Sequence, residues 1–256
     1  MKRILVVGGA NGIGLSIATE LADRPHTEKV YIVDKLPLEK QYAKSKFETF
    51  QFDLTNKDFS FFEKFGDIDA LMITAGFGTL ALFEDVSDQY IEDSFNVNTV
   101  AVVRLIKCFY DKLKSQQDFY CGVMGSIAGF MSSPCFAVYG ASKAALKIFI
   151  ESVNVELEKT GSRNRILNVS PGSIPGTSFN NGKTDLSQTA SLAKQIIQHL
   201  EEKSDLFIPQ YEEIFKDVLA RYHQDFRAEG LHSYDYKMHS GRMGDKNKSI
   251  EEEPKR

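Results

Sequence analysis

The sequence predicts an α/β fold: a doubly wound, Rossmann-type, mostly parallel sheet with helices on both faces, in a single domain. Short apolar runs alternate with longer segments of helical periodicity along most of the chain. This alternation is typical of parallel sheets that helices cover on both faces. A glycine cluster follows the first apolar run, which is the second observation. The third is the length of 256 residues, close to the limit of one hydrophobic core, so one domain with a tail is expected.

The elements are expected in the following order. Strands are predicted at residues 3–7, 29–33, 48–52, 70–74, 119–124 and 166–169, with an edge strand at 206–209. The first helix carries Ile13, Ile17, Ala18 and Leu21, and further helices are predicted at 58–65, 94–115, 138–159, 187–203 and 211–226. Beyond Gly230 the regular pattern is lost, and the charge-rich residues 245–256 are expected to be mobile. The predicted domain is therefore residues 1–228, and residues 229–256 form a partly mobile C-terminal tail.

Composition excludes several classes of protein. The net charge of −4 predicts no basic surface for nucleic acid. The apolar stretch Ile4–Val7 is too short for the core of a signal peptide, and no segment approaches membrane-spanning length, so no membrane partner is expected. Three cysteines without metal-like spacing fit a reducing compartment, which favours a cytoplasmic location. The five histidines show no paired ligand spacing, so no metal site is expected.

The turn after the first strand predicts a phosphate site. Its glycines are Gly8, Gly12 and Gly14. Asn11 directly precedes Gly12, and Ile13 lies between Gly12 and Gly14. Glycine tolerates positive φ and lets a pyrophosphate approach the backbone, while the following helix offers unpaired N–H groups to that anion. The alternative is a tight turn that contains glycine for steric reasons only. The glycine turn opens an N-terminal βαβ unit, and this position favours dinucleotide binding over a purely steric turn.

Two aspartates bear on the adenosine end of that dinucleotide. Asp34 ends the second strand about 20 residues after the glycines, where an acid accepts hydrogen bonds from the ribose. A carboxylate there would repel the 2′-phosphate of NADP, so NAD is favoured over NADP, although Lys35 stands beside it. Asp53, followed by Leu54, is placed to meet the adenine amino group; a turn or cap role is the alternative.

A catalytic constellation is predicted in the middle of the chain. Tyr139 and Lys143 are four residues apart in a helical segment, so both side chains project from one face. Ser126 follows the strand 119–124, which places its hydroxyl at the carboxyl edge of a parallel sheet, where ligands of such folds bind. Asn98 is expected early in the helix after the previous strand.

These residues together resemble the short-chain dehydrogenase/reductase family, in its classical branch, over about residues 3–209. The matching residues are Gly8, Gly12, Gly14, Asp53, Ala75, Gly76, Asn98, Ser126, Tyr139, Lys143, Pro171 and Gly172. The resemblance implies that Tyr139 is the general acid/base and that Ser126 binds the substrate oxygen. It also implies that Lys143 binds the nicotinamide ribose and lowers the tyrosine pKa, and that Asn98 holds a water of the proton relay. Residues 1–228 would then be the NAD(P)-binding catalytic domain, with Ile174 and Thr177 also touching the cofactor.

The chain departs from the family pattern at several positions. Val7 stands where a threonine usually precedes the first motif glycine, and Thr74 stands where asparagines usually precede Ala-Gly, which puts the support of the central strand in doubt. The threonine expected to hold the nicotinamide amide comes one residue late, as Thr177. An aromatic helix and tail replace the glycine-rich close that is common in the family.

The substrate is expected to be an apolar small molecule with a carbonyl or secondary alcohol. The segments predicted to close the pocket carry large apolar side chains, mostly aromatic, that favour it: Phe77, Phe83, Phe130, Met131, Phe136 and Phe179. Apolar residues on more than one face of the helices 94–115 and 138–159 predict a homodimer or homotetramer. The alternatives to an oxidoreductase are a nucleotide-sensing regulator on the same fold without turnover and an epimerase or dehydratase of the extended relatives.

Overall fold

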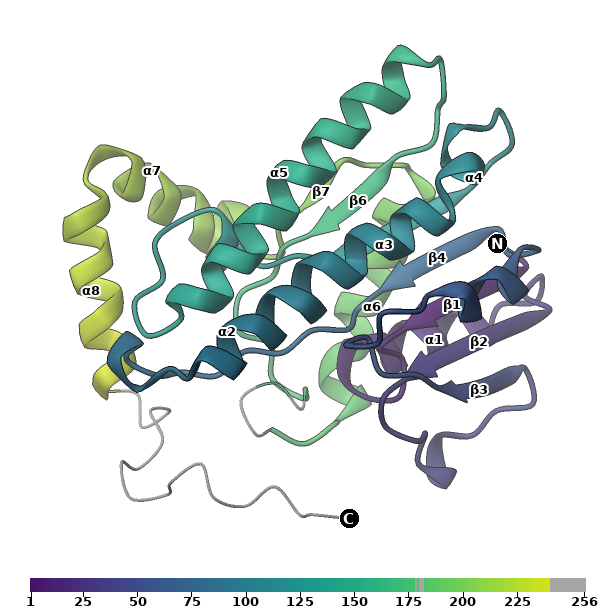
Figure 1. The fold of residues 1–256 in the computed structure, drawn as a ribbon, viewed down its shortest axis with the longest axis horizontal. Coiled ribbons are helices and arrows are strands. Elements are labelled where there is room, and N and C mark those ends of the chain that lie inside the picture. The colour runs from purple at the N-terminus through teal and green to yellow at the C-terminus, as the bar shows by residue number, and fades with distance from the viewer. Residues whose placement is uncertain (178, 180–181, 240–256) are drawn as a thin grey trace.

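The computed structural model describes residues 1–177, 179 and 182–239, and a parallel seven-stranded sheet runs through it (Figure 1). The strands are β1 Arg3–Val7, β2 Lys29–Asp34, β3 Phe47–Gln51, β4 Ala70–Ile73, β5 Tyr120–Met124, β6 Ile166–Val169 and β7 Leu206–Phe207. Their order is β3-β2-β1-β4-β5-β6-β7, and all six neighbouring pairs are parallel. The order reverses between β1 and β4, where open α/β sheets bind ligands beyond their carboxyl ends. The predicted fold class is confirmed.

Helices cover both faces of this sheet. They are α1 Gly12–Ala22, α2 Asp88–Phe95, α3 Ala101–Cys108, α4 Tyr110–Lys114, α5 Ala137–Lys159, α6 Leu186–Glu201, α7 Lys216–Gln224 and α8 Phe226–His239. Short 3₁₀ turns lie at Lys40–Tyr42, Ser60–Phe65, Phe83–Asp85 and Ile127–Gly129, and π turns at Asn96–Val100 and Tyr211–Phe215.

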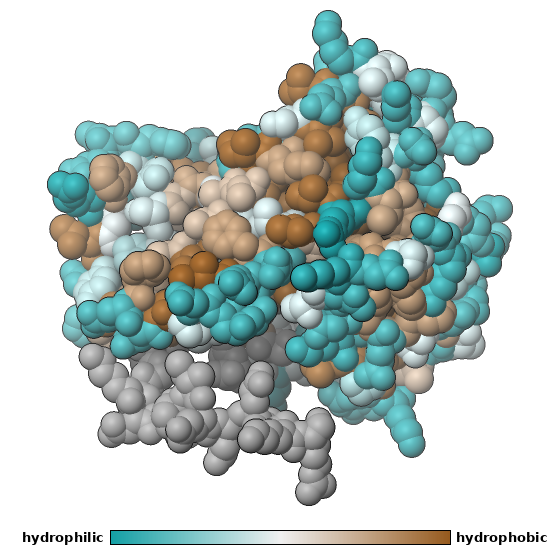
Figure 2. Space-filling model, viewed as in Figure 1, coloured by the Kyte–Doolittle hydropathy of each residue, from teal (hydrophilic) through white to brown (hydrophobic). Residues whose placement is uncertain are grey.

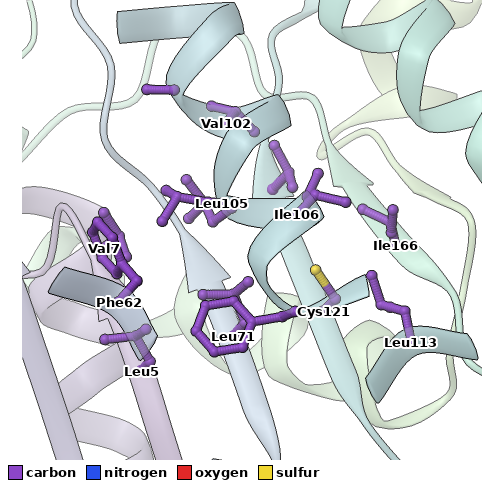
Figure 3. Packing of buried hydrophobic residues seen from close by; sticks show 14 of the residues in the cluster. Leu5, Val7, Phe62, Leu71, Val102, Leu105, Ile106, Leu113, Cys121 and Ile166 are labelled. Carbon is purple, nitrogen blue, oxygen red and sulfur yellow. The ribbon is translucent and has the colours of Figure 1, made fainter. Parts of the chain in front are cut away.

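Two hydrophobic cores result, one on each face of the sheet. Side chains alternate along β1, so Leu5 and Val7 point to one face while Ile4 and Val6 point to the other. On the first face α3, α4 and α5 pack on the strands. Figure 3 shows labelled side chains of α3 and α4 against those of β1, β4, β5 and β6. On the second face α1 and α6 pack on the strands and on each other. The central strands β1, β2, β4, β5 and β6 are buried on both faces, which explains why they read as continuous apolar runs, whereas the edge strands β3 and β7 are partly exposed.

Some predicted elements differ from the observed ones. Residues 58–65 contain a 3₁₀ turn rather than an α-helix. The helix predicted to start at 94 starts at Asp88, because the Ser87 side chain caps it by accepting a hydrogen bond from Tyr90 N. Asn98 therefore lies inside a continuous helical stretch, in its π turn, and not near the start. The last strand ends at Phe207, before Pro209.

The C-terminal region is more regular than the sequence predicts. The expectation that regular structure ends near Gly230 was wrong, because α8 continues to His239. Tertiary contacts hold this helix: Lys237 Nζ donates to Ser133 Oγ at 2.7 Å and to the Pro134 carbonyl at 2.8 Å. A Cβ at position 230 would lie 3.2 Å from Ser132 Oγ, so the glycine allows a close approach of α8 to the same segment. Residues 245–256, predicted to be mobile, lie outside the described part of the chain.

The aromatic stripe of residues 211–226 lies mainly at the surface, with one ring half-buried against the loop after β6. Phe215 packs against Gly172, where a Cβ would lie 2.6 Å from its ring. Tyr211 and Phe226 are exposed. Within the described residues, no helix combines the length and the apolar composition that crossing a membrane requires.

Candidate active site

The turn between β1 and α1 has the backbone that the glycine spacing predicts. Gly8 has φ of +87° and Gly12 has φ of +52°, conformations that other residues rarely adopt. A Cβ on Gly8 would lie 2.6 Å from Ala75 Cα, and one on Gly14 would clash with Gly8 O. The turn therefore presses against the end of β4, and α1 starts immediately beside it. The first turn of α1, all of which is described, carries no acidic residue of its own that would repel an anion.

Thr74 supplies the support that the missing asparagines put in doubt. Its hydroxyl lies 3.1 Å from the Val7 carbonyl and 2.9 Å from the Gly8 carbonyl, to which it donates. The backbone adds two bonds, because Thr74 N and Ala75 N both donate to Val7 O. A hydroxyl at the end of β4 thus joins this strand to the glycine turn, and the departure from the family pattern leaves the turn intact.

A loop that follows β6 folds over the glycine turn. Gly12 N donates to Thr184 Oγ1 at 3.2 Å, and the Thr177 side chain lies 3.6 Å from the position of a Cβ on Gly12. Thr177 Oγ1 donates to the Ile174 carbonyl at 3.0 Å. The predicted cofactor residues Ile174 and Thr177 are therefore close to the phosphate-binding turn. Thr184 was not predicted, since nothing in its local sequence distinguishes it from an ordinary loop threonine.

The start of that loop lies beside the candidate serine. The carbonyl of Pro171 accepts a hydrogen bond from Ile127 N at 3.0 Å, next to Ser126. Gly172 lies against the Phe215 ring. These contacts place the predicted Pro-Gly pair at the same edge of the sheet as the glycine turn.

Asp34 and Asp53 lie at the carboxyl ends of β2 and β3. The Asp34 carboxylate accepts from Ala10 N and Leu36 N, both at 3.0 Å, so it is fixed against the glycine turn. Asp53 forms an ion pair with Lys35 at 3.3 Å and accepts from Thr55. Although burial raises the pKa of Asp53, hydrogen bonds from Thr55 and Lys35 lower it on balance.

The surroundings of these aspartates offer room for a flat group. A cavity of about 280 Å³ is lined by Asp34 and Leu36 together with residues of β3. The Leu54 side chain is 8% exposed and belongs to the first hydrophobic core, so only its backbone faces this region.

The four candidate catalytic side chains converge at this edge of the sheet. The Ser126 side chain lies close enough to Tyr139 to oppose the rise of the tyrosine pKa that burial causes. Lys143 Nζ lies 5.8 Å from the centre of the Tyr139 ring and donates to the Met124 carbonyl at 2.8 Å. Asn98 Oδ1 and Lys143 Nζ both approach Gly76, at 3.1 Å and 3.2 Å from the position of a Cβ there. The absence of a side chain on Gly76 leaves the space between these two groups open.

Asn98 holds the loop after β4. Its Oδ1 accepts from Phe77 N at 3.0 Å, and its Nδ2 donates to the Phe77 carbonyl at 2.9 Å. Nδ2 also lies 3.2 Å from Ser142 Oγ on α5. Asn98 therefore ties three elements together next to the tyrosine, which is a positioning role beside the predicted relay.

Burial governs the charges of the tyrosine and the lysine. It raises the pKa of Tyr139 to about 12, and the Ser126 side chain opposes this shift. Burial lowers the pKa of Lys143 to about 8. Both shifts favour the uncharged form, as desolvation requires. A group that brings charge to this site would therefore strongly affect the ionisation of both.

Aromatic rings surround Tyr139. The Phe136 ring centre is 5.0 Å away and that of Phe179 is 5.4 Å away. A Cβ on Gly78 would lie 2.7 Å from Tyr139 Cδ2, so the loop after β4 lies directly on the ring. The described residues hold no group of three His, Cys, Asp or Glu side chains arranged for a metal ion.

Comparison with known proteins agrees with this geometry. Residues 2–188 match a family model described as short chain dehydrogenase. Retinol dehydrogenase 8 of Bos taurus is 25% identical over 233 residues, which are 85% of this chain and 73% of that protein. For four further curated relatives the matched part is only 54% to 62% of their length, less than two thirds.

Solved structures share the fold. A short-chain dehydrogenase/reductase from Burkholderia phymatum in complex with NAD has a TM-score of 0.73 at 17% identity, covering 89% of this chain and 95% of that one. A short-chain dehydrogenase from Sphingobium yanoikuyae in complex with NADPH has a TM-score of 0.69 at 21% identity, covering 89% and 96%.

The buried lysine yields a stability prediction. Lys143→Met should raise the free energy of unfolding by about 2 kcal/mol near neutral pH, because a folded-state pKa of about 8 means that burying the ammonium opposes folding. The unfolded chain binds this proton more tightly than the folded one between about pH 8 and the ordinary value of 10.5, so the wild-type protein regains stability as pH rises through that window. The advantage of the variant should shrink over the same range.

Urea unfolding at neutral and alkaline pH measures the difference. Lys216→Met is the matched control, since Lys216 is an exposed lysine that pairs with Glu212 on the surface. If Lys143→Met were less stable than wild type near neutral pH, burial of the Lys143 ammonium would not oppose folding.

Proposed function

Because this chain belongs to the short-chain dehydrogenase family, we propose that it is an oxidoreductase that transfers a hydride between NAD(H) and a carbonyl or secondary alcohol of an apolar small molecule. The observation that carries the proposal is the convergence of Ser126, Tyr139 and Lys143, with Lys143 Nζ 5.8 Å from the centre of the Tyr139 ring. A phenol, a hydroxyl and an amine gathered in this way form a proton-transfer site next to a turn built for phosphates. The bound nicotinamide would supply or accept the hydride.

The residues of this chain would divide the remaining work. Tyr139 donates a proton to the substrate oxygen in reduction and accepts one in oxidation. Ser126 donates a hydrogen bond to that oxygen and orients it. Lys143 binds the nicotinamide ribose and, while protonated, favours the phenolate of Tyr139. Asn98 keeps the loop after β4 in place and holds a water of the proton relay.

The protonation states favour the acid role of Tyr139 at neutral pH. Its pKa of about 12 in the protein alone means that the phenol keeps its proton, which ketone reduction requires. Alcohol oxidation requires the phenolate, so positive charge must arrive beside the ring to lower the pKa. A protonated Lys143 and an oxidised nicotinamide both carry such charge.

The cofactor would lie across the carboxyl ends of β1, β2 and β4. The residues that fit it by position are Gly8, Asn11, Gly12, Ile13 and Gly14 for the pyrophosphate, Asp34, Asp53 and Leu54 for the adenosine, and Ala75, Gly76, Tyr139, Lys143, Pro171, Gly172, Ile174 and Thr177 for the nicotinamide half. The cradle at Gly8 and Gly12, which a Cβ could not share, supports this assignment. The cytoplasmic location stays a prediction from the sequence.

Tyr139→Phe should keep NADH binding and lose turnover by on the order of a hundredfold or more, because phenylalanine cannot donate the proton. The measurement follows NADH absorbance with a panel of ketones and alcohols, alongside NADH titration by fluorescence. Tyr110→Phe on α4, away from the site, serves as the control. Near-normal turnover by Tyr139→Phe would remove the tyrosine from the proposed role.

Asp34 yields a prediction of cofactor preference. The wild-type protein should bind NADH more tightly than NADPH, because the fixed carboxylate repels a 2′-phosphate. Asp34→Asn removes the charge and keeps one oxygen, which can accept from either Ala10 N or Leu36 N but not from both. The ratio of the two dissociation constants should therefore shift toward NADPH by about tenfold. Asp53→Asn is the control for a nearby carboxylate that Lys35 already neutralises. Tighter binding of NADPH to the wild type would defeat the assignment.

We also propose that the protein is a homo-oligomer that uses the outer faces of α3 and α5. Ile148 and Val155 on α5 are 58% and 67% exposed, and Val100 beside α3 is 43% exposed. Figure 2 shows hydrophobic residues gathered over the region where Figure 1 places these two helices. Exposed apolar faces of this kind are typical of subunit interfaces.

Sedimentation velocity tests the assembly. The wild type should sediment as a dimer or tetramer, and the double variant Ile148→Asp, Val155→Asp should sediment as a monomer, since two buried carboxylates disrupt an apolar interface. Phe226→Asp, which alters an equally exposed aromatic residue on α8, should leave the mass unchanged. A monomeric wild type, or a loss of assembly only in Phe226→Asp, contradicts the assignment of this face.

A further inference from the structure

Tyr90 brings a second phenol to the cavity beside Tyr139. The cavity is lined by Thr79, Ala81, Phe83, Val86, Tyr90, Cys135, Phe136, Ala137, Val138 and Tyr139. Ten residues from two distant segments thus meet, one segment after β4 and the other at the start of α5. The two tyrosines are near enough that charge on Tyr90 raises the pKa of Tyr139.

The Tyr90 side chain is held in one orientation. Its backbone N–H donates to Ser87 Oγ at 3.2 Å, which fixes the first turn of α2. Its ring meets the Phe77 ring edge-on, with centres 5.7 Å apart. Its hydroxyl oxygen accepts a hydrogen bond from Thr79 N at 2.9 Å. The loop after β4 and the helix α2 therefore position this phenol before any ligand enters, which lowers the entropic cost of using it.

The hydroxyl retains its own proton for a ligand. Among the contacts that the described residues make, Tyr90 Oη accepts one hydrogen bond and donates none. A phenol carries one donor as well as its acceptor sites, so the bond from Thr79 leaves the donor to be used. The rest of the wall is mainly apolar, made of Ala81, Phe83, Val86, Phe136 and Val138 among others. A donor fixed in a mainly apolar wall discriminates strongly between ligand atoms.

The size of the cavity limits what can reach this donor. It encloses about 10 Å³, room for roughly one water molecule. The group that meets Tyr90 must therefore be small, and a hydroxyl or carbonyl oxygen meets that limit. Phe83, which is 68% exposed, stands at the solvent side of the same wall.

We propose that Tyr90 is a specificity-determining residue that donates its phenolic hydrogen to a second oxygen of the substrate, remote from the reacting carbon. The proposal rests on the proposed oxidoreductase function and narrows it: the substrate class is an apolar carbonyl or alcohol that carries a second oxygen acceptor. Tyr139 and Ser126 would hold the reacting oxygen, while Tyr90 holds the other one. The step is a hydrogen bond only, so no bond of the substrate forms or breaks there.

The experiment compares acetophenone derivatives of one shape. The probes are para- and meta-diacetylbenzene, whose second carbonyl accepts a hydrogen bond, and para- and meta-isopropylacetophenone, which lack that acceptor. In either the para or the meta pair, the kcat/KM of the wild type should be about tenfold higher for the diacetyl compound than for its isopropyl counterpart. This is the ratio that one hydrogen bond in an apolar site supplies. Tyr90→Phe should reduce the preference to about twofold or less while kcat/KM for the isopropyl compounds stays within about twofold. Tyr222→Phe on α7 is the control.

A binding measurement separates this proposal from the proposed function. Dissociation constants of the same four probes are measured by calorimetry with NAD⁺ in place of NADH, so that no ketone can be reduced during the titration. A preference in binding that Tyr90→Phe abolishes, without turnover of any probe, would support Tyr90 and overturn the oxidoreductase proposal. If the wild type bound the diacetyl and the isopropyl compound equally well in both the para and the meta pair, the proposed role of Tyr90 would be overturned. This outcome is measured on the wild type alone, so it does not depend on the folding of a variant. An equal loss for diacetyl and isopropyl compounds in Tyr90→Phe would likewise overturn it and show a structural role.

Discussion

The site depends on one steric constraint, the close approach of the ends of β1 and β4. Gly8 lies against the backbone of Ala75 with no room for a side chain, and the Thr74 hydroxyl bonds the Gly8 carbonyl. This approach brings the phosphate-binding turn and the loop that follows β4 to one place. From there Gly76 faces Asn98 and Lys143, and Gly78 rests on the Tyr139 ring. A side chain at Gly8 would therefore disturb the turn and, through the same loop, the tyrosine.

Burial explains the electrostatic character of the same region. Because Tyr139 and Lys143 are both buried, each is shifted toward its uncharged form, and the protein alone does not hold a stable phenolate–ammonium pair. The Met124 carbonyl keeps Lys143 near the ring as a dipole acceptor rather than a counter-ion. Such a site responds strongly to charge brought by a ligand, since little solvent screens it. The burial of Lys143 thus lowers the stability of the protein alone. The same lack of solvent around Tyr139 and Lys143 allows a bound charged ligand to change their pKa values strongly.

Local sequence predicted the parts of the fold and site that depend on local chemistry. Apolar runs located the central strands because these are buried on both faces, and Tyr139 and Lys143 share a helix face because of their spacing. Contacts between distant segments could not be predicted in this way. Thr184 reaches Gly12 across 172 residues, and Lys237 reaches Ser133 across 104. The helix α8 has no apolar stripe for periodicity to detect, and Thr74 replaces an asparagine through a bond visible only in three dimensions.

The same division explains where specificity can reside. The candidate proton-transfer residues lie just after β5, on α5 and in the stretch around Asn98, all held by the core. The cavity wall comes from the loop after β4 and the segment before α5, which Lys237 binds through Ser133 and Pro134. In that segment Cys135 has φ of +63°, and its carbonyl accepts from Ala81 N at 2.9 Å, so the two parts of the wall bond directly to each other. Changes in the wall or in α8 can therefore alter which substrate fits while the catalytic side chains keep their positions.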